Sequence, residues 1–248
     1  MGTVGLVLVG VAAGALNSAG GGGTFVALPA LVAAGLPPVT ANAASTVALL
    51  PGALSGAWAY RHELGPVGPA SATAMAAASA LGGLVGAVAL VVSAAAAFAA
   101  AVPWLLAFAT AVLAVGRPLV RVVGLDLAFA ARPLLGCQFV LAIYGGYFGG
   151  AVGILMVALW SIGTGLDAAT GNPMRVAQLA ATNLPAAALF LVASDVLSAA
   201  APTAVVLAGA LAGGYLGARV ARVLPAGVLR AIVLLVAVTS TAVYIARG

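Results

Sequence analysis

Charge and cysteine are what this sequence has little of. Only 5% of its 248 residues are charged, lysine is absent, and cysteine occurs once, at Cys137. A lone cysteine excludes a disulfide or a thiolate metal site within one chain, so we expect Cys137 to serve packing. The nine basic residues, all arginine, are spread singly between apolar segments. This pattern argues against a nucleic-acid partner and favours a topology signal.

Groups that could carry enzyme chemistry are equally scarce. The one histidine is His62, and the four carboxylates, which all fall in or near expected loops, are Glu63, Asp126, Asp167 and Asp195. An intramembrane metalloprotease needs several ligands that converge at depth, and a proton relay needs ionisable groups there. We therefore predict no catalytic residue, no metal site and no cofactor.

Apolar residues dominate the chain. They make up 65% of it, and the mean hydropathy is +1.26, which is typical of an integral membrane protein. The N-terminus lacks the positively charged start of a signal peptide and is expected to belong to the mature fold. Small-residue pairs predict close helix packing, and their faces suggest a homodimer. Examples are Gly82 with Gly86 and Gly213 with Gly217. Trp58, Trp104 and Trp160 are interpreted as interface anchors or packing residues.

Eight apolar segments follow one another along the chain. They cover residues 4–36, 39–60, 67–92, 94–115, 133–165, 176–193, 197–218 and 228–246. About 20 residues span a bilayer as a helix, so six segments predict single crossings. The first and fifth segments are longer, and each holds a glycine cluster near its middle: GGGG at 20–23 and GGYFGG at 145–150.

The two long segments open two similar halves. Aligning Gly21 with Gly149 also aligns Leu31 with Leu159, and after a short insertion Pro51 aligns with Pro185. Repeats with interrupted helices at matching places are typical of secondary transporters. The predicted fold is an all-α polytopic membrane protein and one structural domain. Its parts are a first inverted repeat at 1–116, a cytoplasmic linker at 117–132 and a second inverted repeat at 133–248.

The arginines indicate how the long segments sit in the membrane. If each long segment crossed once, the arginines would divide almost evenly between the two sides. If each turned back at its glycines as a re-entrant hairpin, all but Arg247 would lie on one side, as the positive-inside rule requires. Each half then has an odd number of crossings. The halves would therefore be inverted, and both termini would lie outside.

The glycine clusters predict helix breaks that hold an anion. A helix beginning after such a break points unpaired amides and the positive end of its dipole into the gap, and glycine allows close approach. Polar side chains nearby would orient the ligand. The predicted substrate-binding residues are Asn17, Ser18, Gly20, Gly21, Gly22, Gly23, Thr24, Asn42, Ser45, Thr46, Tyr144, Gly145, Gly146, Tyr147, Gly149, Gly150, Gln178 and Asn183, with Thr182 as a further contributor.

Two alternatives stand beside this interpretation. The glycines could serve packing alone, although clusters this dense cost more helix stability than one contact requires. Arg61 and Arg175 could recruit an anion at the cytoplasmic mouth or could be solvated topology charges.

The motifs together resemble a known family. GGGGTFVALPAL, followed by GLPPVTANAASTVALLPGALSGAWAYR, and YGGYFGGAVGILMVALWSIG, followed by NPMRVAQLAATNLPAAALF, resemble the two halves of the TauE/SafE sulfite exporter family, also called the toluene sulfonate uptake permeases. The resemblance covers nearly the whole chain. It implies a bacterial inner-membrane permease for sulfite, sulfoacetate or a related sulfur-containing anion. It also implies that 20–24, Asn42, Ser45, Thr46, 145–150 and Asn183 lie near the substrate.

Export of an anion from a cell that is negative inside is electrically downhill by about 2.3 kcal/mol per charge per 100 mV. We therefore expect facilitated export by alternating access without a coupling ion. Proton-coupled uptake, a channel-like permease for a neutral solute, and a membrane assembly protein without a substrate stay open as alternatives.

Overall fold

The computed structural model describes residues 2–123, 128–166, 170–223 and 226–247. The described chain is helical apart from its connections and one isolated bridge between Val67 and Ala70. In chain order the elements are α1 (Thr3–Gly20), α2 (Thr24–Ala33), α3 (Pro38–Ala59), α4 (Ala72–Val92), α5 (Ala95–Val123), α6 (Ala131–Tyr147), α7 (Val152–Thr164), α8 (Asn172–Ala193), the 3-10 turn η1 (Asp195–Ala199), α9 (Ala200–Val223) and α10 (Ala226–Arg247). The stretch expected as a linker, 117–132, is helical at both of its ends.

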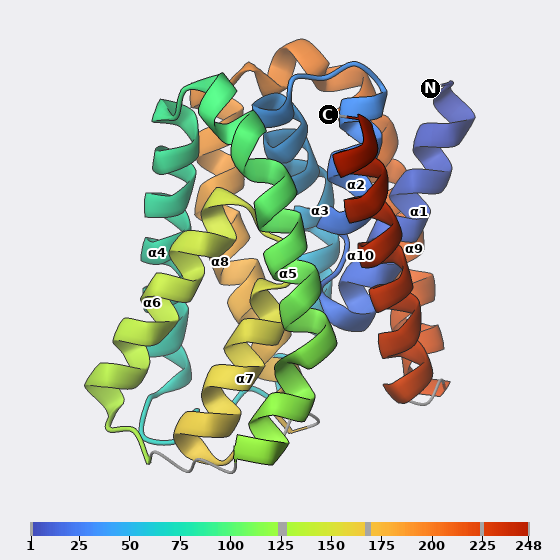
Figure 1. Cartoon of the computed structure of the whole chain (residues 1–248). Coiled ribbons are helices and arrows are strands. Elements are labelled where there is room, and N and C mark those ends of the chain that lie inside the picture. Colours follow the sequence, from blue (N-terminus) through green and yellow to red (C-terminus); the bar gives the residue numbers. More distant parts are fainter. Residues whose placement is uncertain (1, 124–127, 167–169, 224–225, 248) are drawn as a thin grey trace.

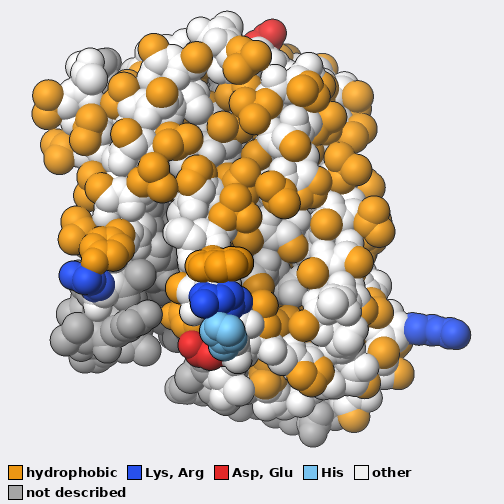
Figure 2. Space-filling model, turned by 180° about the vertical axis from the view of Figure 1, so that it is seen from behind, with side chains coloured by type: hydrophobic (Ala, Val, Ile, Leu, Met, Phe, Trp, Pro, Cys, Tyr) orange, Lys and Arg blue, Asp and Glu red, His pale blue; other side chains and the backbone are white. Residues whose placement is uncertain are grey.

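Four helical stretches among the described residues are long and apolar enough to cross a membrane. They are Ala72–Val92, Ala95–Val112, Asn172–Ala193 and Asp195–Gly217. Large apolar side chains cover the outside of the molecule, with Trp104 on α5 exposed to 78%. Figure 2 shows this hydrophobic covering, with the basic side chains toward the lower end of the face and an acidic side chain at the upper end. A multi-pass membrane protein follows from this surface.

The chain reverses direction at each glycine cluster (Figure 1). α1 descends from the upper end and stops inside the molecule, and α2 returns upward; α6 rises from the lower end, and α7 returns downward. The helices between them run from one end to the other, and both termini lie at the upper end. The helix breaks predicted at the two glycine clusters are therefore confirmed.

Most arginines belong to helix ends at the lower end of Figure 1. Arg61 follows the end of α3, Arg132 is in the first turn of α6, and Arg175 is in the first turn of α8. The last turns of α5 carry Arg117 and Arg121, those of α9 carry Arg219 and Arg222, and Arg230 is near the start of α10. Arg247 ends α10 at the upper end.

Two lines of contact in which glycines of one helix touch the backbone of another, here called glycine seams, hold long helices together. On α4, Gly82 and Gly86 abut the backbone carbonyls of α6, and on α9, Gly213 and Gly217 abut the backbone of α1. A methyl group at any of these positions would overlap a carbonyl oxygen, so only glycine allows the approach. The predicted packing role of these four glycines is confirmed. They are used within the chain, and a homodimer stays a prediction.

Candidate functional site

The first break lies between α1 and α2. Gly21 ends α1 in the left-handed conformation, with φ of 76°, and its amide donates to the carbonyl of Asn17. Gly23 is the N-cap of α2 and no side chain caps it. A side chain on Gly21 would point at Arg175, whose Nη1 lies 3.2 Å from the position of the missing Cβ. The break therefore leaves room for a guanidinium beside bare backbone.

The second break lies between α6 and α7. Gly149 has φ of 82°, and Ala151, the N-cap of α7, has φ of 57°. A left-handed conformation costs a residue with a Cβ roughly 1–2 kcal/mol, and such strain persists where the surrounding structure imposes it. Among the described backbone hydrogen bonds, none is donated by the amides of residues 150–153. All four residues are buried, and buried amides without a partner are rare in folded proteins.

The two breaks meet each other. Thr24, the first residue of α2, has its Oγ1 3.4 Å from the position of a Cβ at Gly149. Arg175 joins the breaks from α8, because its Cγ lies 3.2 Å from the position of a Cβ at Gly153 in α7 while its Nη1 faces Gly21. Residues from both halves of the chain, more than 100 positions apart, thus form one region, as the sequence predicts for two opposed helix starts.

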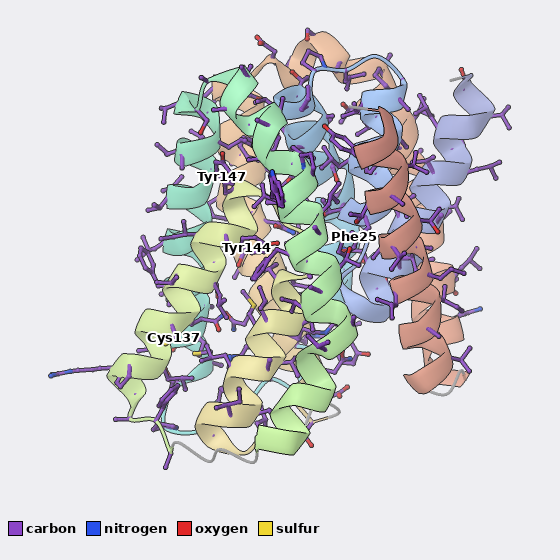
Figure 3. The ribbon with its side chains drawn as sticks, viewed as in Figure 1. Phe25, Cys137, Tyr144 and Tyr147 are labelled. Carbon is purple, nitrogen blue, oxygen red and sulfur yellow. The ribbon has the colours of Figure 1, made fainter. Side chains whose placement is uncertain are left out.

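Three buried polar atoms on α3 and α6 have no hydrogen-bond partner: Asn42 Oδ1, Ser45 Oγ and Tyr144 Oη. Asn42 and Ser45 are each 1% exposed, and Nδ2 of Asn42 donates to the carbonyl oxygen of Tyr147 at 2.9 Å. Tyr144 and Tyr147 project from α6 toward α5 (Figure 3), where their rings pack against Phe108 and Phe98. A buried polar atom without a partner is costly, so each of these atoms suits a ligand.

Arg175 differs from the interpretation as a solvated topology charge. It is only 5% exposed, and its Nε and Nη2 donate to Asn172 Oδ1 at 3.1 and 2.8 Å. Arg61 is exposed and stacks on the ring of Trp58 at 4.5 Å, where its Nη1 donates to the Trp58 carbonyl. The two arginines that the sequence pairs at one mouth therefore occupy different environments.

Other predicted residues lie around the breaks in more ordinary roles. Thr46 donates to the carbonyl of Asn42 on its own helix. Ser18 Oγ lies 3.5 Å from the position of a Cβ at Gly214, so this side chain faces α9. Asn17 and Asn183 are half-buried.

A chain of buried hydrogen bonds below the second break was not predicted from the sequence. The chain links one side chain from each of four helices: Trp160 of α7, Gln138 of α6, Ser79 of α4 and Gln178 of α8. Of these, only Gln178 is a predicted site residue. Trp160 is 1% exposed and therefore lies in the interior rather than at a membrane interface, whereas Trp58 is exposed beside Arg61.

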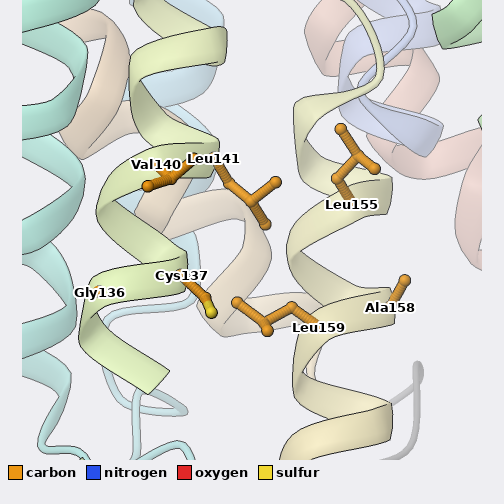
Figure 4. Close-up of a pocket in the computed structure, with 7 residues that line it drawn as sticks. All are labelled: Gly136, Cys137, Val140, Leu141, Leu155, Ala158 and Leu159. Carbon is orange, nitrogen blue, oxygen red and sulfur yellow. The ribbon is translucent and has the colours of Figure 1, made fainter. Parts of the chain in front are cut away.

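A cavity of about 470 Å³ lies elsewhere, between α6 and α7 (Figure 4). Its lining is apolar and consists of Gly136, Cys137, Val140, Leu141, Leu155, Ala158 and Leu159. Cys137 is exposed, so the expectation that it serves interior packing is wrong. The cavity offers no donor to an anion, and the candidate site is therefore the region between the breaks.

His62, Glu63 and Asp195 are exposed at the two ends of the molecule, and Asp126 and Asp167 lie outside the described residues. Across the part of the chain that the structure describes, no three histidine, cysteine or carboxylate side chains are grouped so that they could hold a metal ion.

A polytopic helical membrane protein with two broken helices that meet at a polar region has the architecture of a solute transporter. The comparison with protein families agrees, because residues 6–244 match the family described as Sulfite exporter TauE/SafE. The chain belongs to this family, which is a family of membrane sulfite exporters. Comparisons with curated proteins and with solved structures gave no match.

Proposed function

We propose that this protein exports a small sulfur-containing anion, such as sulfite or sulfoacetate, through a site between the two helix breaks. The observation that carries the proposal is a set of buried polar groups without partners on the helices that adjoin the two breaks. These groups are Asn42 Oδ1, Ser45 Oγ, Tyr144 Oη and the amides that begin α7. In a membrane protein such groups are tolerated where they line a polar or ligand-filled space.

The N-termini of α2 and α7 supply the anion-binding chemistry. Both helices begin at glycine-rich breaks without a side-chain cap. Among the described backbone hydrogen bonds, none is donated by the amides of Gly23 and Thr24 or by those of residues 150–153. These amides and the two helix dipoles are therefore available to a ligand. The contact between Thr24 and Gly149 supports two opposed sets of donors. Arg175, which reaches both breaks from α8, would orient an oxyanion through its planar guanidinium.

The unpaired side-chain oxygen of Asn42 narrows the choice of anion. A backbone carbonyl only accepts, so the bond to Tyr147 fixes Nδ2 of Asn42 as the donor and leaves Oδ1 as a free acceptor. A ligand with several acceptor oxygens suits the donors of this site, and pairing with the Asn42 acceptor requires one hydrogen-bond donor in addition. Hydrogensulfite meets that requirement, and so does a sulfonate that carries an amino group.

The architecture that would move the anion is a pair of inverted repeats, each with a re-entrant hairpin. Helix pairing supports this arrangement, because contacts recur when the halves are exchanged: α1 packs on α9 as α6 packs on α4, and α2 packs on α10 as α7 packs on α5. The hairpins enter from opposite ends (Figure 1). With eight of the nine arginines toward the lower end, that end would be cytoplasmic in a bacterial inner membrane and both termini periplasmic.

Membrane potential is the proposed driving force. A site built from amides, hydroxyls and one buried arginine has no carboxylate among its described residues to couple a proton. Outward movement of a monovalent anion gains about 2.3 kcal/mol per 100 mV in a cell that is negative inside. Alternating exposure of the site to the two sides would complete the cycle.

Flux measurements in proteoliposomes test the proposal. Vesicles loaded with sulfite should release it faster when a potassium gradient with valinomycin makes the lumen negative, and a voltage-independent flux of neutral solutes should be absent. Accumulation driven by a pH gradient at clamped voltage would establish proton-coupled uptake instead. Flux of a neutral solute without competition by sulfite or sulfonates would establish a channel-like permease. No flux of any sulfur anion would overturn transport itself.

A further inference from the structure

Four buried side chains below the second break form one continuous line of hydrogen bonds. Trp160 Nε1 donates to Gln138 Oε1 at 3.0 Å, and Gln138 Nε2 donates to Ser79 Oγ at 2.8 Å. Ser79 Oγ donates in turn to Gln178 Oε1 at 2.8 Å. Each of the four residues is at most 1% exposed. The line joins α7, α6, α4 and α8.

The direction of donation along this line is fixed at one end. An indole N–H can only donate, so Gln138 must accept through Oε1 and has only Nε2 left for Ser79. The Ser79 hydroxyl accepts that bond, and in the structure it donates its own proton to Gln178 Oε1. Gln178 therefore has its acceptor occupied, and its Nε2 makes no hydrogen bond with any described residue. The line ends in a free donor.

Gln178 stands on the turn of α8 that faces the breaks. Arg175, three residues before it, contacts the positions of Gly21 and Gly153. Leu179, the next residue, also contacts both, and Thr182 Cγ2 lies 3.0 Å from the position of a Cβ at Gly145.

We infer that Trp160, Gln138 and Ser79 are positioning residues that hold the Gln178 amide with its N–H groups toward the transported anion. Without them, the amide of Gln178 could rotate and present its oxygen, which repels an oxyanion. Selectivity for anions at this site is thus set partly by a tryptophan three hydrogen bonds away. The inference rests on the proposed function, since it concerns the same site.

Gln138→Glu is the sharpest test, because it nearly preserves shape while it can reverse the line. An ionised carboxylate only accepts, so it would take a bond from Trp160 and another from the Ser79 hydroxyl. Ser79 would then accept from Gln178 Nε2 and turn the Gln178 oxygen toward the anion. The protonated acid, which burial favours, can still donate to Ser79 and keep the native direction.

The variant is assayed by sulfoacetate flux, because both acid groups of this substrate stay ionised from about pH 6 to about pH 9. Titratable side chains on the elements around position 138 are confined to α6 and α8, since α4 and α7 carry none; they are Arg132, Cys137, Tyr144, Tyr147 and Arg175. We expect KM of Gln138→Glu to rise about ten-fold or more over this range as the carboxyl ionises, with wild-type KM nearly flat.

Ser79→Ala and Trp160→Phe cut the line without adding a charge. Both should raise KM about three-fold or more and change the maximal rate little, because they act on anion binding. Thr241→Val is the matched control: its hydroxyl pairs with Thr110 between α5 and α10 at 3.0 Å and has no link to the line. If Gln138→Glu does not fold, these three variants carry the test by themselves.

The inference is overturned if Ser79→Ala and Trp160→Phe keep KM within about two-fold of wild type, or if Thr241→Val raises it equally. A pH-independent KM increase in folded Gln138→Glu would also overturn it, because that result indicates a packing defect. Absence of anion flux by the wild-type protein would instead reject the proposed function, so the two failures are distinguishable.

Discussion

Ser45→Ala should stabilise the empty protein and weaken its anion binding. The Ser45 hydroxyl is buried to 99% and has no partner, and an unsatisfied buried polar group costs about 1–3 kcal/mol. Removal of the hydroxyl recovers part of that cost, which corresponds to a rise of about 2–4 °C in Tm per kcal/mol for a chain of this length. A hydrogen bond to an anion contributes about 1.5–3 kcal/mol, so its loss weakens binding about ten- to hundred-fold.

The assay is thermal unfolding in detergent, with and without sulfite at a series of concentrations, and with liposome flux in parallel. Ligand binding raises Tm by mass action, so the same titration gives stability and affinity. Ser79→Ala is the matched control for stability, since Ser79 is equally buried but makes two hydrogen bonds. It should lower Tm. If Ser45→Ala lowered Tm as Ser79→Ala does, or bound sulfite as tightly as wild type, Ser45 would be a structural residue and our argument would be refuted.

Three further predictions concern other parts of the site. Gly149→Val should abolish flux while leaving membrane insertion intact, because a β-branched residue at φ of 82° costs at least about 1–2 kcal/mol and would crowd Thr24. Flux assays measure transport, and size-exclusion profiles measure whether the variant is inserted and folded. Retained flux would contradict a role for the second break. Arg175→Gln should raise KM about ten-fold or more through loss of a charged donor, whereas Arg61→Gln, which removes the exposed guanidinium that stacks on Trp58, should change KM less than about two-fold. Equal effects of the two substitutions would show that Arg175 does not bind the anion. Asn42 Oδ1 is a free acceptor that hydrogensulfite, but not the deprotonated sulfite ion, can donate to. Sulfite flux should therefore fall as pH rises, while sulfoacetate flux should not. Parallel pH profiles for the two substrates would contradict the role of Asn42 as an acceptor for the ligand.

The glycine pattern predicted the breaks correctly because its physical meaning is local. Each glycine in a helix interior costs about 1 kcal/mol relative to alanine, so a run of four strongly favours a helix end. The sequence also predicted Asn42, Ser45 and Tyr144 as binding residues, because these polar residues lie near the glycine clusters in otherwise apolar segments, and that role stays a prediction. The structure leaves an atom of each of these three without a partner.

Contacts between residues far apart in the chain could not be predicted from the sequence. Arg175 lies near a helix start, where an arginine is usually solvated, yet it is buried, with Gly21 and Gly153 from two other elements close to its side chain. Ser79 and Gln138 are single polar residues in apolar helices, and nothing in their spacing shows that they bond to each other. The exposure of Cys137 was also not predictable from the sequence. Apolar neighbours in the sequence do not show whether a helix face points toward the interior or toward an open cavity.

The glycine seams determine which helices can travel together. Gly213 and Gly217 of α9 press on the backbone of α1, while Gly82 and Gly86 of α4 press on that of α6. Each seam pairs a helix of the first half with a helix of the second, and a shift of one residue along either would drive methyl groups into carbonyl oxygens. If the proposed transport cycle operates, we therefore expect α1 to move together with α9 and α4 together with α6, so that each moving body contains helices from both halves of the sequence.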